Sequence, residues 1–156
     1  RIIISRNILR KYALDNKYDY FLSLEQDVIP PRNIIERLIN YEKNIVSGIY
    51  FVHNAENNLI PLVYKNVKND EIRNLTFYEI KDPNFIEIDA CGLGCVLISR
   101  KVLEKVSFRY DPKEEAFDDM WFSLDATNAG FKIYCDTSVK CKHLIKGRWS
   151  WADIKK

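Results

Sequence analysis

The chain has 156 residues, of which 47% are hydrophobic and 29% are charged, and its net charge is +2 at neutral pH. This composition excludes a disordered or low-complexity protein, and the near-neutral charge provides no general field to attract nucleic acid. No run of eighteen or more apolar residues and no signal peptide is visible, so no transmembrane segment is expected. We therefore expect residues 1–156 to form a single cytoplasmic domain that does not bind nucleic acid.

The first third of the chain alternates between helical and strand patterns. Apolar residues at helical spacing predict a helix over 6–16, and the apolar run 18–24 predicts a strand directly after it. The prolines Pro30 and Pro31 are expected to begin a second helix, and residues 45–52 are typical of a buried strand. Helix, strand, helix, strand is the alternation of a parallel sheet.

The pattern of the remaining residues predicts a less regular succession of helices, strands and loops. Residues 53–84 are rich in asparagine and charge, and we expect a polar insertion with a hairpin there. Ser99 is expected to cap a helix, and Gly130 to close another one. The further predicted elements are strands at 85–89, 95–98, 131–135 and 139–143 and a helix at 118–129.

The four cysteines stand at spacings that match no zinc site. Small buried thiols are the default expectation for Cys91, Cys95, Cys135 and Cys141. A disulfide between the two cysteine-bearing segments is the alternative for a protein from a hyperthermophile or its virus.

The triplet Glu25-Gln26-Asp27 follows the strand predicted at 18–24. If the strand continues through it, Glu25 and Asp27 share a face and can both reach one hard cation, while Gln26 points the other way. Ligands of open α/β sheets bind beyond the carboxyl ends of the strands, which is where this triplet stands. The alternative is a solvated turn without a ligand.

Three further motifs could carry chemistry. Asp118 and Asp119 begin a predicted helix, where they could act as a base or simply stabilise the first turn. His143 could add an imidazole ligand that favours manganese, or it could be structural. The glycines of Gly92-Leu93-Gly94 could let the backbone approach a ligand, or could only form a bulge.

In their order along the chain, these motifs resemble those of glycosyltransferases with the GT-A fold, above all the family-2-like members. The matching segments are Arg6-Asn7, Glu25-Gln26-Asp27, the stretch 89–94, Asp118-Asp119 and His143. The resemblance implies a Rossmann-like α/β fold, typical of nucleotide-diphospho-sugar transferases, with a mixed sheet flanked by helices. Family members begin with a nucleotide-binding unit, and we find only part of its pattern in this sequence, so we expect an N-terminal truncation before Arg1.

The same resemblance implies a hexosyltransferase-like enzyme that moves a sugar from a UDP- or GDP-sugar to a hydroxyl of a glycan, lipid or protein, with inversion. It implies Mn²⁺ or Mg²⁺ bound by Asp27, Glu25 and His143, with Asp119 as the general base and Asp118 as its helper. The donor-binding residues are then Arg6, Asn7, Gln26, Lys146 and Arg148, and the acceptor-binding residues are Gly92, Leu93, Gly94 and Trp121. Trp149 and Trp151 either stack on the donor or only pack.

Two other functions fit the same motifs. One is a catalytically degenerate GT-A domain that binds sugars or a protein, which the glutamate at position 25 in place of aspartate favours. The other is a sugar nucleotidyltransferase, although the glycine-rich basic loop expected near its start is absent.

Overall fold

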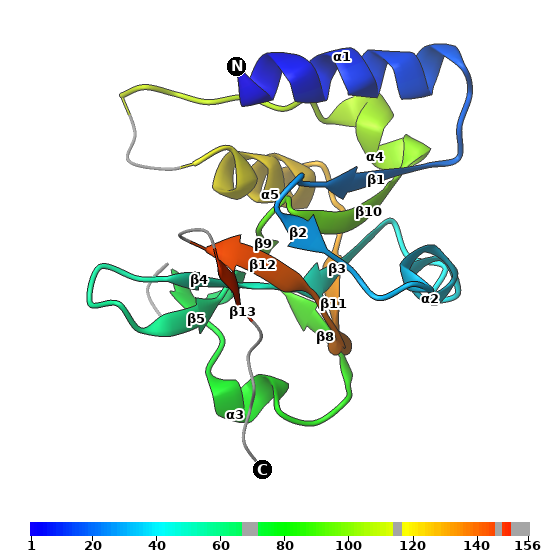
Figure 1. The fold of residues 1–156 in the computed structure, drawn as a ribbon. Coiled ribbons are helices and arrows are strands. Elements are labelled where there is room, and N and C mark those ends of the chain that lie inside the picture. The colour runs from blue at the N-terminus through cyan, green and yellow to red at the C-terminus, as the bar shows by residue number, and fades with distance from the viewer. Residues whose placement is uncertain (67–71, 114–116, 146–147, 151–156) are drawn as a thin grey trace.

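The centre of the protein is a mixed five-stranded sheet (Figure 1). The computed structural model describes residues 1–66, 72–113, 117–145 and 148–150, with the backbone alone at 145 and 148–150. Strand β11 runs parallel to β3, and the other neighbouring strands are antiparallel. The sheet order is β1 (Tyr20–Leu24), β10 (Cys95–Ser99), β3 (Ile45–Ile49), β11 (Ile133–Lys140) and β8 (Phe85–Ile88). The chain therefore has a mixed α/β fold.

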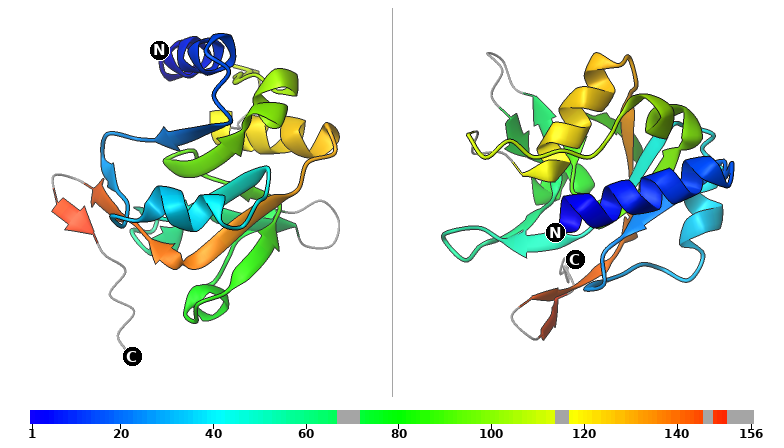
Figure 2. Two further views of the ribbon diagram at one scale, coloured as in Figure 1. Left: turned by 90° about the vertical axis from the view of Figure 1, so that its right-hand side faces the viewer. Right: turned by 90° about the horizontal axis from the view of Figure 1, so that it is seen from above.

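Helices cover both faces of this sheet, as the two views of Figure 2 show. On one side lie α1 (Ile2–Asp15), α4 (Arg100–Lys105) and α5 (Asp118–Asn128). On the other side lies α2 (Ile34–Ile39). A short helix, α3 (Phe77–Ile80), begins with a capping box in which Thr76 and Glu79 bond each other's backbone N–H groups.

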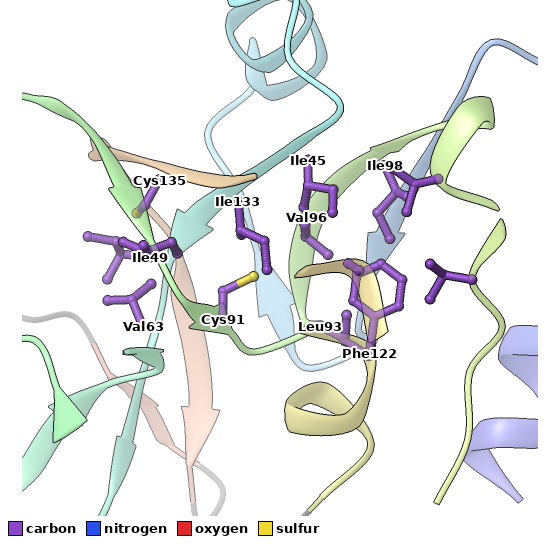
Figure 3. Packing of buried hydrophobic residues seen from close by; sticks show 14 of the residues in the cluster. Ile45, Ile49, Val63, Cys91, Leu93, Val96, Ile98, Phe122, Ile133 and Cys135 are labelled. Carbon is purple, nitrogen blue, oxygen red and sulfur yellow. The ribbon is translucent and has the colours of Figure 1, made fainter. Parts of the chain in front are cut away.

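Two apolar cores form because alternate residues of a strand point to opposite faces. Ile45 and Ile49 of β3 pack into the core beneath α1, α4 and α5, whereas Val46 packs into the core beneath α2. Figure 3 shows the first core, where Phe122 of α5 packs close to Val96 and the other sheet residues. Burial on both faces explains why β10 is apolar at four successive residues, Cys95 to Ile98.

Three smaller sheets extend the fold away from the centre. Strands β4 (Phe51–His53) and β5 (Leu59–Pro61) form an antiparallel hairpin. Strand β6 (Val63–Asn66) pairs with β7 (Ile72–Asn74) and with β9 (Ala90–Cys91). Strand β12 (Lys142–Ile145) pairs with β13 (Arg148–Ser150) and with β2 (Val28–Ile29). Segment 53–84 thus contributes to two antiparallel hairpins.

The prediction of a parallel sheet from the first four elements was wrong in detail. Strands β1 and β3 do point the same way, but β10 lies between them and is antiparallel to both. The helix expected at the prolines begins only at Ile34, because Pro30 and Pro31 follow the short strand β2. The strand expected over 45–52 divides into β3 and β4 at Tyr50.

Several boundaries also differ from the predictions. Helix α1 begins at Ile2, well before the expected start, and β11 runs on through the gap expected after residue 135. Ser99 does precede α4, but its hydroxyl donates to the side-chain oxygen of Asn44 and does not cap the helix. Gly130 follows α5 with φ of +85°, which confirms the predicted glycine stop. No helix among the described residues is long and apolar enough to cross a membrane.

Candidate functional site

The acidic triplet forms a turn at the end of β1 and does not continue the strand. The backbone N–H of Val28 donates to the carbonyl of Glu25 at 3.1 Å, which closes the turn. The N–H of Glu25 donates to the carbonyl of Gly94, also at 3.1 Å, and ties the turn to the glycine segment. The alternation expected of a strand is therefore absent, and Gln26 lines the same pocket as Glu25 and Asp27.

Arg6 of α1 is the centre of the site. Its buried guanidinium donates to Glu25 Oε1 at 2.5 Å, to Ser23 Oγ at 2.9 Å and to Asp118 Oδ2 at 3.0 Å. Ser23 in turn donates to the carbonyl of Leu93 at 2.6 Å. One side chain thereby joins α1, the end of β1 and the start of α5, and a single cation pairs with both carboxylates.

Two pockets meet at the Arg6–Glu25 ion pair, because both residues line both of them. The first pocket, of about 450 Å³, is lined by Arg1, Ile2, Ser5, Arg6, Leu9, Glu25, Gln26 and Asp27. The second pocket, of about 410 Å³, is lined by Arg6, Glu25, Tyr50, Val52, Ile60, Leu62, Tyr64, Leu93, Phe117, Asp118, Asp119 and His143.

Asp118 and Asp119 lie in the first turn of α5 but have different surroundings. Asp118 is paired with Arg6, whereas no cation of the described residues pairs with Asp119, whose Oδ1 accepts the N–H of Met120 at 2.8 Å. Burial raises the pKa of Asp119 to about 6, and the negative charges of Asp118 and Glu25 act in the same direction. Such a carboxylate accepts a proton more readily near neutral pH than an ordinary aspartate does.

The structure brings His143 and Asp27 together between the two pockets. The Nε2 atom of His143 lies 3.5 Å from Asp27 Oδ2, and the N–H of Leu144 donates to the carbonyl of Asp27 at 2.8 Å. Nδ1 of His143 lies 2.7 Å from the carbonyl oxygen of Phe51, an acceptor, so Nδ1 carries a proton. In the neutral ring, Nε2 then presents its lone pair towards Asp27.

The donor atoms fit a divalent cation with two protein ligands. Among the described residues no group of three or more His, Cys, Asp or Glu side chains is placed to hold one ion. Glu25, expected as a third ligand, is bound to Arg6 instead. Mg²⁺ and Mn²⁺ are commonly held by one or two carboxylates with substrate phosphates, so Asp27 and His143 suit a cation that a diphosphate completes.

The glycine segment makes room for Tyr50 and not for a ligand. A Cβ atom on Gly92 would stand 2.2 Å from the Tyr50 hydroxyl, and one on Gly94 would stand 2.7 Å from the ring. The N–H of Gly94 donates to that hydroxyl at 3.0 Å. Burial and the charge of Glu25 raise the pKa of Tyr50, so the phenol stays neutral. Leu93 alone of the segment lines the second pocket.

Two predicted site residues lie elsewhere. The side-chain amide of Asn7 bonds both backbone groups of Phe108, at 2.7 Å and 3.1 Å, and so fastens α1 to the segment after α4. Trp121 lies under the guanidinium of Arg109, 3.8 Å from the ring centroid, and Arg109 also bonds Asp125. Neither residue lines the two pockets.

The predictions near the C-terminus fall largely outside what the structure describes. Lys146 and Trp151 lie outside the described residues, and of Arg148 and Trp149 only the backbone is described, as part of β13. The four cysteines are buried free thiols, which agrees with the default expectation from the sequence.

Sequence reasoning missed most of the second pocket. Tyr50, Val52, Ile60, Leu62, Tyr64 and Phe117 were not among its candidates. Positions 50 and 52, and positions 60, 62 and 64, follow the period of two that places side chains on one face of a strand. That alternation was the available signal.

Comparison with known proteins gives a likeness in structure. No protein-family model matches the chain, and no curated protein is similar to it in sequence. The fold is similar to the crystal structure of A197 from STIV, with a TM-score of 0.64 and 25% sequence identity. The likeness covers 99% of this chain and 74% of A197.

Proposed function

We propose that the protein is a metal-dependent glycosyltransferase of the GT-A type, which transfers a sugar from a nucleotide-diphosphate donor to a hydroxyl with inversion. One observation carries the proposal. The two pockets adjoin along Arg6–Glu25, with Asp27 lining the first, His143 lining the second, and the two side chains 3.5 Å apart. A donor in one pocket and an acceptor in the other would meet beside a divalent cation.

The first pocket is assigned to the donor. Arg1 and Gln26 line it together with Asp27, so it offers a cation and an amide to diphosphate oxygens. A bound Mn²⁺ or Mg²⁺ would neutralise the charge that develops on the departing diphosphate. Asp27 and His143 would hold that ion, and Glu25 would serve to orient Arg6 rather than bind metal.

The second pocket is assigned to the acceptor, with Asp119 as the general base. Its pKa of about 6 leaves it mostly ionised at pH 7 yet basic enough to take a hydroxyl proton. Asp118 is held by Arg6 and is a positioning residue. The acceptor oxygen would attack the sugar carbon from the face opposite the departing diphosphate, which inverts that carbon, while its proton passes to Asp119.

Calorimetric titration of UDP and GDP tests this function, with and without Mn²⁺. We expect micromolar binding of one nucleotide that requires the metal. Asp27→Ala should abolish the metal-dependent part, whereas Asp82→Ala, which removes an exposed carboxylate, should leave it unchanged. Metal-dependent binding by Asp27→Ala would contradict the assignment of the metal site.

Asp119→Asn tests the base separately from the donor. The variant should bind the nucleotide as the wild type does, and it should transfer or hydrolyse the donor sugar about 10²- to 10⁴-fold more slowly. Wild-type turnover by this variant would exclude Asp119 as the base.

A second function, metal-independent sugar binding, is favoured by the Arg6–Glu25 pair, which leaves only Asp27 and His143 to hold a metal. Sugar binding that is unaffected by EDTA, without nucleotide binding, would support this binding module. No described feature favours a nucleotidyltransferase over these two.

A further inference from the structure

The second pocket has an apolar wall. It is made by one face of strands β4, β5 and β6 and of the residues that flank them. The hairpin register pairs Val52 with Ile60, and antiparallel partners point to the same side. The N–H of Leu62 donates to the carbonyl of Tyr50 at 3.0 Å, which continues that pairing by one step. We call the five side chains Tyr50, Val52, Ile60, Leu62 and Tyr64 the apolar panel; all five line the second pocket.

The alternate side chains of the same segments point into the core. Phe51 and Val63 are buried there, and Phe51 stacks on Phe77 with ring centroids 5.5 Å apart. The panel side chains lie on the opposite face, where strands with one solvated side ordinarily carry polar residues. Val52, Ile60 and Leu62 are instead aliphatic and only partly buried. Tyr50, at one end of the panel, is itself buried in the core beneath α2, and Leu62 packs against that core.

Hydrogen-bonding capacity on this wall is low. Three of its five side chains have no polar atom, and the Tyr50 hydroxyl already accepts the N–H of Gly94. The backbone along the wall is also paired, through the β4–β5 ladder and the Leu62 N–H. A free sugar held here would leave hydroxyl groups without partners, which costs free energy in a site that excludes water.

The acidic side of the pocket faces this wall. The charge of Asp119 adds to burial in raising the pKa of Tyr64 to about 12, so the two groups are close enough to interact and Tyr64 stays neutral. Phe117, which immediately precedes the acidic pair, is 76% exposed and lines the same pocket. The pocket thus combines one candidate base with apolar and aromatic surroundings.

We propose that the acceptor is a lipid-like alcohol, whose hydrocarbon body lies on the apolar panel between Phe117 and Leu62 and whose hydroxyl reaches Asp119. This inference rests on the proposed function, and it selects the lipid from the glycan, lipid and protein acceptors that the family resemblance allowed. Affinity comes from burial of the hydrocarbon, and it rises with each methylene group that is removed from water.

The test compares two probes that share a sugar and differ in their alkyl chain, n-octyl β-glucoside below its micelle concentration and methyl β-glucoside. Methyl-group NMR should show octyl glucoside shifting Val52, Ile60 and Leu62, with methyl glucoside at least tenfold weaker. Leu62→Gln should weaken octyl glucoside binding about tenfold. Ile35→Gln, which alters an exposed apolar residue of α2, should not.

The nucleotide titration distinguishes failure of this inference from failure of the proposed function. Equal binding of both glucosides, or shifts away from the panel, would overturn the lipid acceptor, while metal-dependent UDP or GDP binding would still support the transferase. Octyl glucoside bound on the panel of a protein that binds neither nucleotide would overturn the acceptor assignment together with the transferase. If Leu62→Gln lowers the melting temperature, Ile60→Thr gives the same comparison with a smaller change.

With a donor identified, the same probes give a kinetic readout. We expect kcat/KM for octyl glucoside to exceed that for methyl glucoside at least tenfold, with the difference reduced in Leu62→Gln. A preference for methyl glucoside would overturn the proposal.

Discussion

The acidic turn after β1 and the start of α5 each present two carboxylates, and in both places Arg6 binds only one of them. In the turn, Glu25 pairs with Arg6 while Asp27 lies beside His143. In the helix, Asp118 pairs with Arg6 while Asp119 has no cationic partner among the described residues. The same cation thus divides each acidic motif into a structural member that pairs with Arg6 and a second member that does not, although both kinds line the pockets.

The difference between the paired and the unpaired carboxylate of each motif shows how several carboxylates can lie close together without excessive charge repulsion. Three carboxylates around one buried guanidinium would be costly if all were unpaired, because burial disfavours charge. Arg6 pairs with two of them. The cost that remains falls on Asp119, and it appears as a raised pKa.

The largest expected effect comes from removing the shared cation. Arg6→Ala leaves Glu25 and Asp118 without their partner, and we expect a loss of about 3 kcal/mol in the free energy of unfolding. Urea denaturation measures it. Lys11→Ala, which breaks the exposed pair with Asp15, is the control and should change stability by less than about 0.5 kcal/mol. A loss under 1 kcal/mol for Arg6→Ala would mean that Arg6 does not hold the two motifs together.

Neutralising the structural members should have the next largest effect. Glu25→Gln and Asp118→Asn each weaken a charge-assisted bond to the buried guanidinium, and we expect each to lose about 1–2 kcal/mol in chemical denaturation. Equal stabilities for these variants and for Asp27→Asn would contradict the distinction between carboxylates that pair with Arg6 and carboxylates that do not.

Asp119→Asn should stabilise the protein, and only at higher pH. The folded-state pKa of about 6 lies above the ordinary value of 3.8, so wild-type Asp119 favours folding below about pH 4 and loses this contribution as pH rises through 6. Asparagine does not ionise, so the variant should gain about 1–2 kcal/mol over the wild type above pH 6. Melting temperatures at pH 4, 5, 6, 7 and 8 measure the trend. A constant difference across this range would contradict it.

Asp27→Asn should have the smallest effect on stability without metal. Asp27 is partly exposed and 3.5 Å from its histidine partner, so we expect a change within about 0.5 kcal/mol in EDTA. The melting temperature with and without Mn²⁺ provides the second measurement. Wild-type protein should be stabilised by the metal, and Asp27→Asn should not respond.

Much of the fold follows from local patterns, but the order of the strands does not. Helices near 6–16, 34–39 and 118–129 and the strand after Asp19 were predictable from periodicity. The place of β10 between β1 and β3 was not, because that order depends on pairing between residues far apart in sequence. The turn at Glu25 was misjudged for the same reason, since the partner of its N–H is the carbonyl of Gly94.

The candidate site divides in the same way. The motifs Glu25–Asp27, Asp118-Asp119 and His143 were recognisable, and the structure brings them to adjoining pockets. The use of Arg6 was not recognisable, because its partner Asp118 stands 112 residues away. The neighbour that takes up the space beside the two glycines, Tyr50, was not recognisable because it stands more than forty positions earlier in the chain. Three of the five panel residues, Ile60, Leu62 and Tyr64, stand in a segment whose asparagines and charges dominate its composition.

The insertion of β10 between β1 and β3 also sets the order in which the protein can fold. A nascent or truncated chain that ends before residue 95 contains three strands, β1, β3 and β8, that have no hydrogen-bonding partner in the central sheet. Contacts of such long range slow folding, because the loop must close before any pairing energy is gained. The carbonyl of Gly94, which binds the N–H of Glu25, arrives with β10. The acidic turn therefore takes its shape late, after most of the chain has been synthesised.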